Sequence, residues 1–191
     1  MSRADTGSME NRQMTNPPAI TRTMQPDATA PIIEQLRSAF PASEIDSQGA
    51  FATWGATYLD GADYAKQLDG KSWHELDRSY LDRRSDALGF LSTAHLVAVL
   101  PAYLAELVEG GPFSQVPDML LLILTAPDST KLAGLGAARF GQLTQALSEA
   151  QRAAVAATLH RFVQEHPTTA HANAAQIALD RYWLGFLKKG A

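Results

Sequence analysis

The sequence contains no cysteine, and this absence excludes disulfide bonds, thiolate nucleophiles, cysteine-ligated zinc and iron–sulfur clusters. It also lacks an excess of positive charge, because 16 Lys and Arg residues stand against 20 Asp and Glu residues, for a formal net charge of −4. Proteins that bind the phosphate backbone of nucleic acids usually carry a basic face. We therefore expect no nucleic-acid partner.

Long hydrophobic runs are missing as well. The longest continuous apolar run, Met119 to Leu124, is far shorter than the roughly 18 residues that a membrane-spanning helix needs. Residues 1–30 contain no apolar segment of the kind found in secretory signal peptides. From these absences we expect a cytoplasmic protein, or one exported by a route without a cleavable signal, and no membrane partner.

The chain has 191 residues, of which 46% are hydrophobic, so it is long enough for one domain with a buried core. Its first 29 residues are polar, and Pro17, Pro18 and Pro26 interrupt any helix there. The sequence therefore predicts a flexible tail over 1–29 and a helical domain over 30–191.

Apolar residues recur at helical spacing through most of 30–191, which predicts an all-α fold, a compact bundle of about six or seven helices. A helix is favoured over a strand at 119–124, because the sequence offers no second strand to pair with it. Residues 42–69 are expected to be irregular or partly helical. The expected helices run over 31–40, 73–84, 93–109, 119–124, 137–147, 149–165 and 170–189.

Three serines mark expected helix starts. Ser72 and Ser148 are each followed three residues later by Glu or Gln, the pattern of a capping box, and Ser92 precedes the helix over 93–109. That helix is apolar around almost its whole circumference and should lie in the middle of the domain. Pro101 falls inside it, so we expect a kink or a break there.

Motifs that carry chemistry are scarce. The five histidines are His74, His95, His160, His166 and His171. No two of them are four residues apart, the spacing that places two zinc ligands on one helical face. Gly134 and Gly136 lack the third glycine of a dinucleotide-binding turn, and neither a Gly-x-Ser-x-Gly elbow nor a Walker loop occurs. The sequence therefore predicts no metal, no cofactor and no catalytic residue.

The expected helix over 93–109 offers one candidate pocket. With a kink at Pro101, the side chains of His95, Tyr103 and Glu106 could line a concave site for a substrate or a small molecule. The alternative is that the polar strip on this helix is its solvent-facing edge, because exposed glutamate is the rule. That strip consists of His95, Ala102, Glu106 and Glu109.

A candidate partner-binding surface lies in the charged stretch 60–86. Desolvated Arg and Trp side chains dominate the binding energy of many interfaces. The alternative is a solvated face held by pairs such as Arg78 and Asp82, with Trp73 anchored in the core. A third interpretation is nucleic-acid binding through the three arginines. The candidate residues are Trp73, Arg78, Asp82, Arg83, Arg84 and Asp86.

Several segments between residues 72 and 165 resemble a family of bacterial proteins known only as a domain of unknown function. The segments are Trp73 to Leu76, Leu88 to Ser92, Leu100 to Leu104, Phe140 to Thr144 and Gln151 to Val155. The resemblance implies a bacterial, helical, cytosolic domain without established catalytic residues.

Small size, acidity and the lack of catalytic motifs favour a non-enzymatic protein-interaction domain. Small acidic inhibitors use complementary charge to speed association with their targets. The sharper hypothesis is an immunity or antitoxin-type protein that binds and neutralises a toxin or effector. The alternative is an enzyme or a small-molecule-binding helical domain with its pocket near Pro101.

Overall fold

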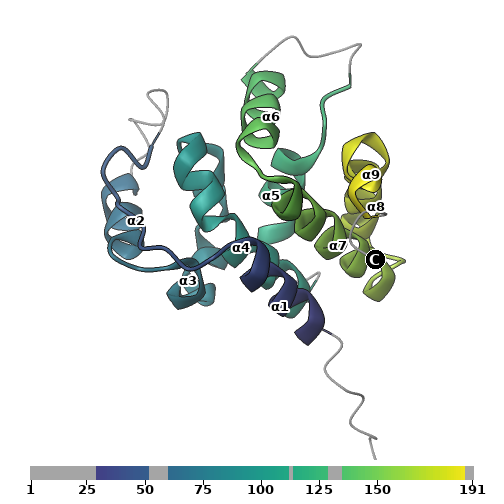
Figure 1. The fold of residues 1–191 in the computed structure, drawn as a ribbon, viewed down its shortest axis with the longest axis horizontal. Helices are drawn as coiled ribbons and strands as arrows, with labels where there is room; N and C mark the ends of the chain where they lie inside the picture. Colours follow the sequence, from purple (N-terminus) through teal and green to yellow (C-terminus); the bar gives the residue numbers. More distant parts are fainter. Residues whose placement is uncertain (1–28, 52–59, 112–113, 129–134, 188–191) are drawn as a thin grey trace, which may run out of the picture.

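The computed structural model describes residues 29–51, 60–111, 114–128 and 135–187, and these are all-α, as the sequence predicts (Figure 1). The α-helices are α1 (Ala30–Ala39), α2 (Gly61–Leu68), α3 (Arg78–Arg83), α4 (Thr93–Gly110), α5 (Val116–Leu124), α6 (Leu135–Ala146), α7 (Glu149–Glu165), α8 (Ala170–Ala178) and α9 (Leu184–Leu187). Most of the predicted tail, residues 1–28, and the turn residue Gly134 lie outside the described residues.

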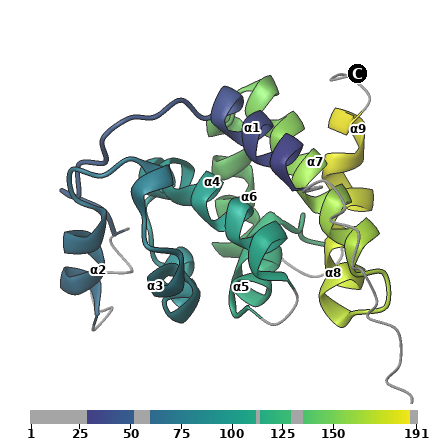
Figure 2. The same cartoon turned by 90° about the horizontal axis from the view of Figure 1, so that it is seen from below.

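Helix α4 lies in the middle of the molecule, with α2 and α3 on one side and α8 and α9 at the opposite end (Figures 1 and 2). It packs against α1, α3, α5, α6 and α7. Ten of its residues are buried, from Leu96 to Val108, on more than one face of the helix. The apolar circumference of this segment therefore identified the central helix correctly.

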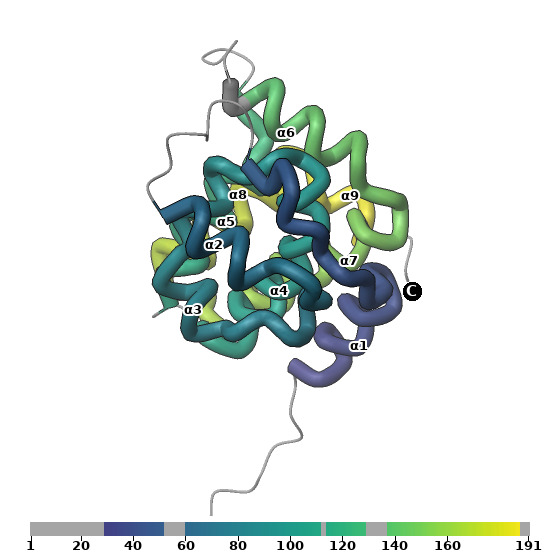
Figure 3. The backbone as a smooth tube through the Cα atoms, turned by 90° about the vertical axis from the view of Figure 1, so that its left-hand side faces the viewer, coloured from purple at the N-terminus to yellow at the C-terminus, as the bar shows by residue number. Residues whose placement is uncertain are grey.

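Helix α1 packs against α7, far along the chain, rather than against its sequence neighbour α2 (Figure 3). Pro31 occupies the first turn of α1, where its missing N–H costs nothing. Ile33 and Leu36 are buried on the inner face of the helix. The connection from α1 then runs across the domain to α2, and Ile45 exchanges backbone hydrogen bonds with Gly70 and Lys71 on the way.

The predicted helix over 73–84 is wrong as a single element. A 3₁₀ turn, η2 (Trp73–Glu75), ends at Leu76, whose φ of −69° and ψ of 134° are extended. Asp77 then starts α3, because its carboxylate accepts hydrogen bonds from the backbone N–H groups of Ser79 and Tyr80. The capping box of Ser72 and Glu75 is present, but it caps only the short turn.

The N-caps at Ser92 and Ser148 are confirmed: Ser92 accepts from the His95 N–H, and Ser148 forms a capping box with Gln151. Helix α4 runs through Pro101 without the break that the sequence allowed. A proline inside a helix costs about 3 kcal/mol, whereas burying each large apolar side chain contributes about 1.5–3 kcal/mol. The buried residues on both sides of Pro101 therefore outweigh its cost.

The predicted C-terminal helix over 170–189 contains a π-helical turn, η5 (Leu179–Trp183), between α8 and α9. A π turn inserts one extra residue into the helical repeat and so changes which side chains face inward. Trp183 is fully buried, and its indole Nε1–H donates to the Leu124 carbonyl at 2.6 Å. This bond ties the end of α5 to the C-terminal helix.

The stretch 42–69 is partly helical, as expected, since α2 covers Gly61–Leu68. Gly70 follows with a φ of 68°, a conformation that favours glycine. Another helical turn, η3 (Ser85–Gly89), leads from α3 into α4. Among the described helices, none is long and apolar enough to cross a membrane.

Candidate functional site

Trp73, part of the predicted partner surface, is a core residue in the structure. Only 5% of it is exposed, and its indole Nε1–H donates to the Phe40 carbonyl at 2.8 Å. A buried indole that has found its acceptor leaves almost no surface for a partner. Trp73 therefore joins η2 to the end of α1, and its assignment to the partner surface is corrected.

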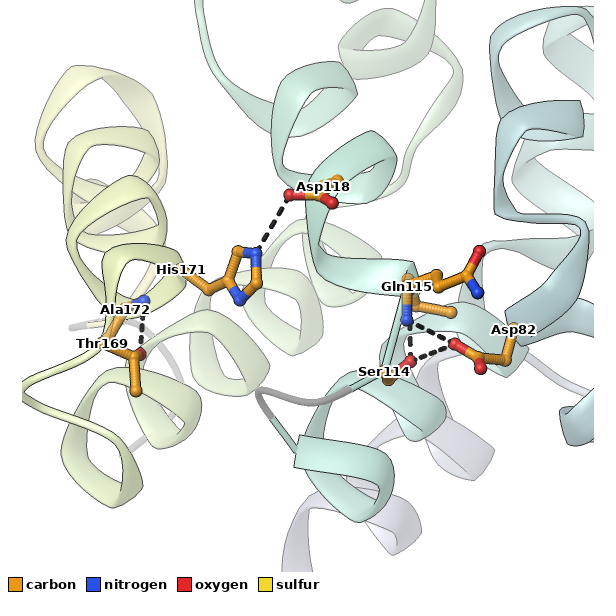
Figure 4. A network of polar contacts seen from close by, with 8 residues as sticks. Asp82, Ser114, Gln115, Asp118, Thr169, His171 and Ala172 are labelled. Carbon is orange, nitrogen blue, oxygen red and sulfur yellow. Dashed lines mark hydrogen bonds and ion pairs between the residues drawn. The ribbon is translucent and has the colours of Figure 1, made fainter.

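Arg78 and Asp82 do not pair with each other. Arg78 forms an ion pair with Glu109 of α4. The Asp82 carboxylate accepts hydrogen bonds from the Ser114 hydroxyl and from the Gln115 backbone N–H, both at 2.5 Å (Figure 4). These two residues hold α3 against the end of α4 and the start of α5.

Arg84 also makes contacts within the chain. Its guanidinium pairs with Asp60 at the start of α2, and its backbone carbonyl accepts from the Tyr103 hydroxyl at 3.3 Å. Arg83 and Asp86, by contrast, are exposed. The charged stretch thus consists mostly of residues that position α2 and α3, with these two side chains on the surface.

Tyrosine hydroxyls continue this polar network into the core. The Tyr64 and Tyr103 hydroxyls lie 2.9 Å apart, and Tyr80 donates to the Asp63 carboxylate at 2.6 Å. Burial, together with the bond to Asp63, raises the pKa of Tyr80 to about 12. The Tyr80 hydroxyl therefore stays protonated at neutral pH, and the three hydroxyls together link α2, α3 and α4.

His95, Tyr103 and Glu106 do not form the predicted pocket. His95 Nδ1 lies 2.7 Å from the Ser92 hydroxyl, and Nε2 lies 2.6 Å from the Asp46 carbonyl. Tyr103 is fully buried against other partners, and Glu106 lies eleven residues from His95, about 16 Å along a helix. His95 thus lies more than two helical turns from Tyr103 and Glu106, and it fastens the 42–51 segment to α4.

Glu106 sits half-buried beside Gly110. A side chain at Gly110 would collide with Glu106 Oε1, so the glutamate lies directly over this helix end. Burial raises the pKa of Glu106, nearby Asp82 raises it further, and Arg78 lowers it. Ionisation of Glu106 is therefore less favourable in the folded protein than in the unfolded chain.

We expect Glu106→Gln to gain stability relative to the wild type as the pH rises. Because the pKa is raised on folding, the native state holds the Glu106 proton more tightly than the unfolded chain does. This tighter proton binding stabilises the folded protein below the usual glutamate pKa of about 4.3. The stabilisation is lost as the pH rises through the higher pKa of the folded state. Urea unfolding at several pH values measures this. Glu34→Gln, at an exposed position of α1, is the control. A difference that stays constant with pH would contradict the expectation.

A different region presents an apolar surface. Leu122, on the outer face of α5, is 69% exposed, and Ile177 of α8 is 39% exposed. Between them lies a groove of about 290 Å³ that we call the Leu122 surface. It is lined by Pro117, Leu121, Leu122, Thr125, Ala174 and Ile177, with Asp118 and His171 at its edge.

The polar edge of this surface is held in place. His171 Nε2 and Asp118 Oδ1 lie 3.0 Å apart and join α8 to the first turn of α5, as Figure 4 shows. On the other side of that turn, Asp82 binds Ser114 and Gln115. The start of α5 is thus fastened from two sides, so the Leu122 surface rests on a fixed helix.

Leu122 also borders a larger hollow, of about 550 Å³, between α5, α6 and η5. We call it the Arg139 hollow. Its apolar lining includes Met119, Leu122, Ile123, Pro127 and Phe140. Its charged lining consists of Arg139, Arg181 and Asp128.

Both arginines are oriented by backbone carbonyls. The Arg139 guanidinium donates to the carbonyls of Leu91 at 2.9 Å and Leu88 at 2.5 Å, and burial lowers its pKa. Arg181 is exposed and donates to the Ala126 carbonyl at 3.1 Å. The hollow therefore has an apolar floor, one half-buried cation in its wall and a second cation at its rim.

Leu122, Arg139 and Arg181 are not among the site residues predicted from the sequence, although the sequence carries one signal for Leu122. Apolar residues over 119–124 on a helix point in every direction, so the helix exposes some of them unless other elements surround it. The two arginines had no local signal, because they reach the hollow from α6 and η5.

Within the described ranges, no three or more His, Asp or Glu residues are grouped closely enough to hold a metal ion. The described residues thus form an all-α domain with two apolar sites side by side, the Leu122 surface and the Arg139 hollow, the second of which is lined by two arginines. No protein-family model matches the sequence, and neither a curated protein nor a solved structure matches it.

Proposed function

We propose that the chain is a non-enzymatic protein-interaction domain that binds its partner through the Leu122 surface. The observation that carries the proposal is the exposure of Leu122, 69%, in the wall of an apolar groove. A contiguous apolar patch rimmed by polar residues is characteristic of interaction sites. Here Asp118 and His171 supply part of the rim.

The partner would present an apolar side chain that fills the groove between Leu122 and Ile177. Protein interfaces have a desolvated apolar centre and a polar rim, and a few central residues carry most of the binding energy. A surface held by two polar contacts at the start of α5 loses little conformational freedom on binding, which favours affinity. In its sharper form, the proposal is that this chain is a cytoplasmic protein of a bacterium and that it neutralises its partner, a toxin or effector.

Co-expression with the product of the neighbouring gene tests this proposal. We expect a complex on size-exclusion chromatography and rescue of any toxicity of that product. Leu122→Glu places a charge in the groove and should weaken the complex about 30-fold or more, as expected for a hot-spot residue.

The matched control is Ala62→Glu, which adds the same charge to an exposed position of α2, on the far side of the molecule (Figure 2). It should bind like the wild type. A complex that Leu122→Glu leaves intact would refute the assignment of the surface, and the absence of both complex and rescue would remove the proposed partner.

The pocket at Pro101 loses support, because His95 is held by the Asp46 carbonyl and Tyr103 is fully buried with its hydroxyl against that of Tyr64. Small-molecule binding instead has a physical basis in the Arg139 hollow.

A further inference from the structure

The Arg139 hollow has the properties of a small-molecule site. Its volume, about 550 Å³, lies within the roughly 300–1,000 Å³ typical of ligand pockets. Such sites are mainly apolar, with a few polar groups that orient the ligand. Met119, Ile123 and Phe140 supply the apolar lining, and the charged groups lie at one wall and at the rim.

The charged residues of the lining favour a ligand with a negative charge. Arg139 and Arg181 contribute two positive charges and Asp128 one negative charge, so the three together carry a net charge of +1. Guanidinium groups match carboxylates well, because their planar N–H donors fit the two carboxylate oxygens. A ligand with an apolar body and one carboxylate would therefore satisfy both parts of the hollow.

Arg181 is the residue best placed to bind the carboxylate. Its side chain is exposed, and its bond to the Ala126 carbonyl holds the guanidinium beside the rim. Arg139 is fixed deeper by the Leu88 and Leu91 carbonyls.

We propose that the Arg139 hollow binds a small amphipathic carboxylate, with its chain against Met119, Ile123 and Phe140 and its carboxylate beside Arg181. This site is distinct from the protein-binding groove between α5 and α8, although Leu122 borders both. The proposal does not depend on the proposed partner.

Isothermal titration calorimetry with decanoate tests the proposal. We expect one decanoate per protein, with binding weakened about tenfold or more when decanol or decylamine replaces it, since a charge-assisted contact is lost or reversed. Arg181→Gln should weaken decanoate binding about tenfold and leave decanol binding unchanged. Arg37→Gln, an equal change of charge at an exposed position of α1, should bind decanoate like the wild type.

A filling variant tests the location. A Cβ at Gly89 would lie 3.7 Å from Met119 Sδ, in ordinary contact, so Gly89→Leu should extend into the hollow and abolish binding of both decanoate and decanol. The Arg181 comparison remains decisive if the Gly89 variant does not fold. Equal binding of decanoate and decanol, equal effects of the Arg181 and Arg37 variants, or no binding of decanoate would each overturn the proposal.

Discussion

Trp183→Ala is expected to lower the free energy of unfolding by about 3–5 kcal/mol, the range measured for deleting large buried aromatic side chains. Trp183 is fully buried and packs edge-on against Phe140 and Tyr182, with ring centroids 6.2 and 4.9 Å away. The substitution leaves a cavity at the junction of α6 and η5. It also removes the indole donor from the Leu124 carbonyl. Urea unfolding followed by circular dichroism measures the loss.

Trp183→Phe separates the two contributions. It keeps an aromatic ring in the core but removes the indole N–H, and an unsatisfied buried carbonyl costs about 1–3 kcal/mol. We therefore expect a smaller loss than for alanine. If phenylalanine and alanine destabilise equally, the hydrogen bond to Leu124 dominates and the packing argument fails.

Leu104→Ala is expected to lower the free energy of unfolding by about 2–5 kcal/mol. Leu104 is fully buried in α4, which packs against helices from both ends of the chain. Because these neighbours are fixed by their own contacts, the cavity cannot collapse fully, and its cost adds to the lost burial of the side chain. The same unfolding measurement applies.

Val97→Ala, on the same helix, provides the comparison. Val97 is only partly buried, and the substitution removes less volume, so the expected loss is well below that of Leu104→Ala. Similar losses for the two variants would contradict the argument that burial and removed volume set the cost of each substitution. A loss below about 1 kcal/mol for Leu104→Ala would contradict its central position.

Most helices could be predicted from the sequence, because N-cap side chains and apolar spacing act within the helix itself. Ser92 and Ser148 cap helices with their own side chains, and the apolar circumference of the 93–109 segment marked the central helix. Asp77 carried the same type of signal for α3, since it is an N-cap residue placed before Ser79 and Tyr80. The capping box at Ser72 concealed this second start, because a box shows where a helical turn begins and not how far it extends.

The partners of the candidate site residues are set by tertiary contacts, and the sequence does not show which of several possible partners each residue binds. Arg78 has an acidic residue four positions away in Asp82, yet each of the two binds a different element. His95 looked like part of a pocket, but its acceptor is the Asp46 carbonyl, 49 residues away. Exposure was equally unpredictable: periodicity places Leu122 on a helix, but only the positions of α6 and α8 decide that this face meets solvent.

The pairing of α1 with α7 governs when the fold can be completed during synthesis. About 110 residues separate the end of α1 at Ala39 from the start of α7 at Glu149, and a ribosome adding about 5–20 residues per second needs roughly 5–20 s to make them. Throughout that interval the apolar side of α1, with Ile33 and Leu36, has no α7 to cover it. The nascent chain therefore exposes this side of α1 to aggregation and chaperone capture until α7 has been released.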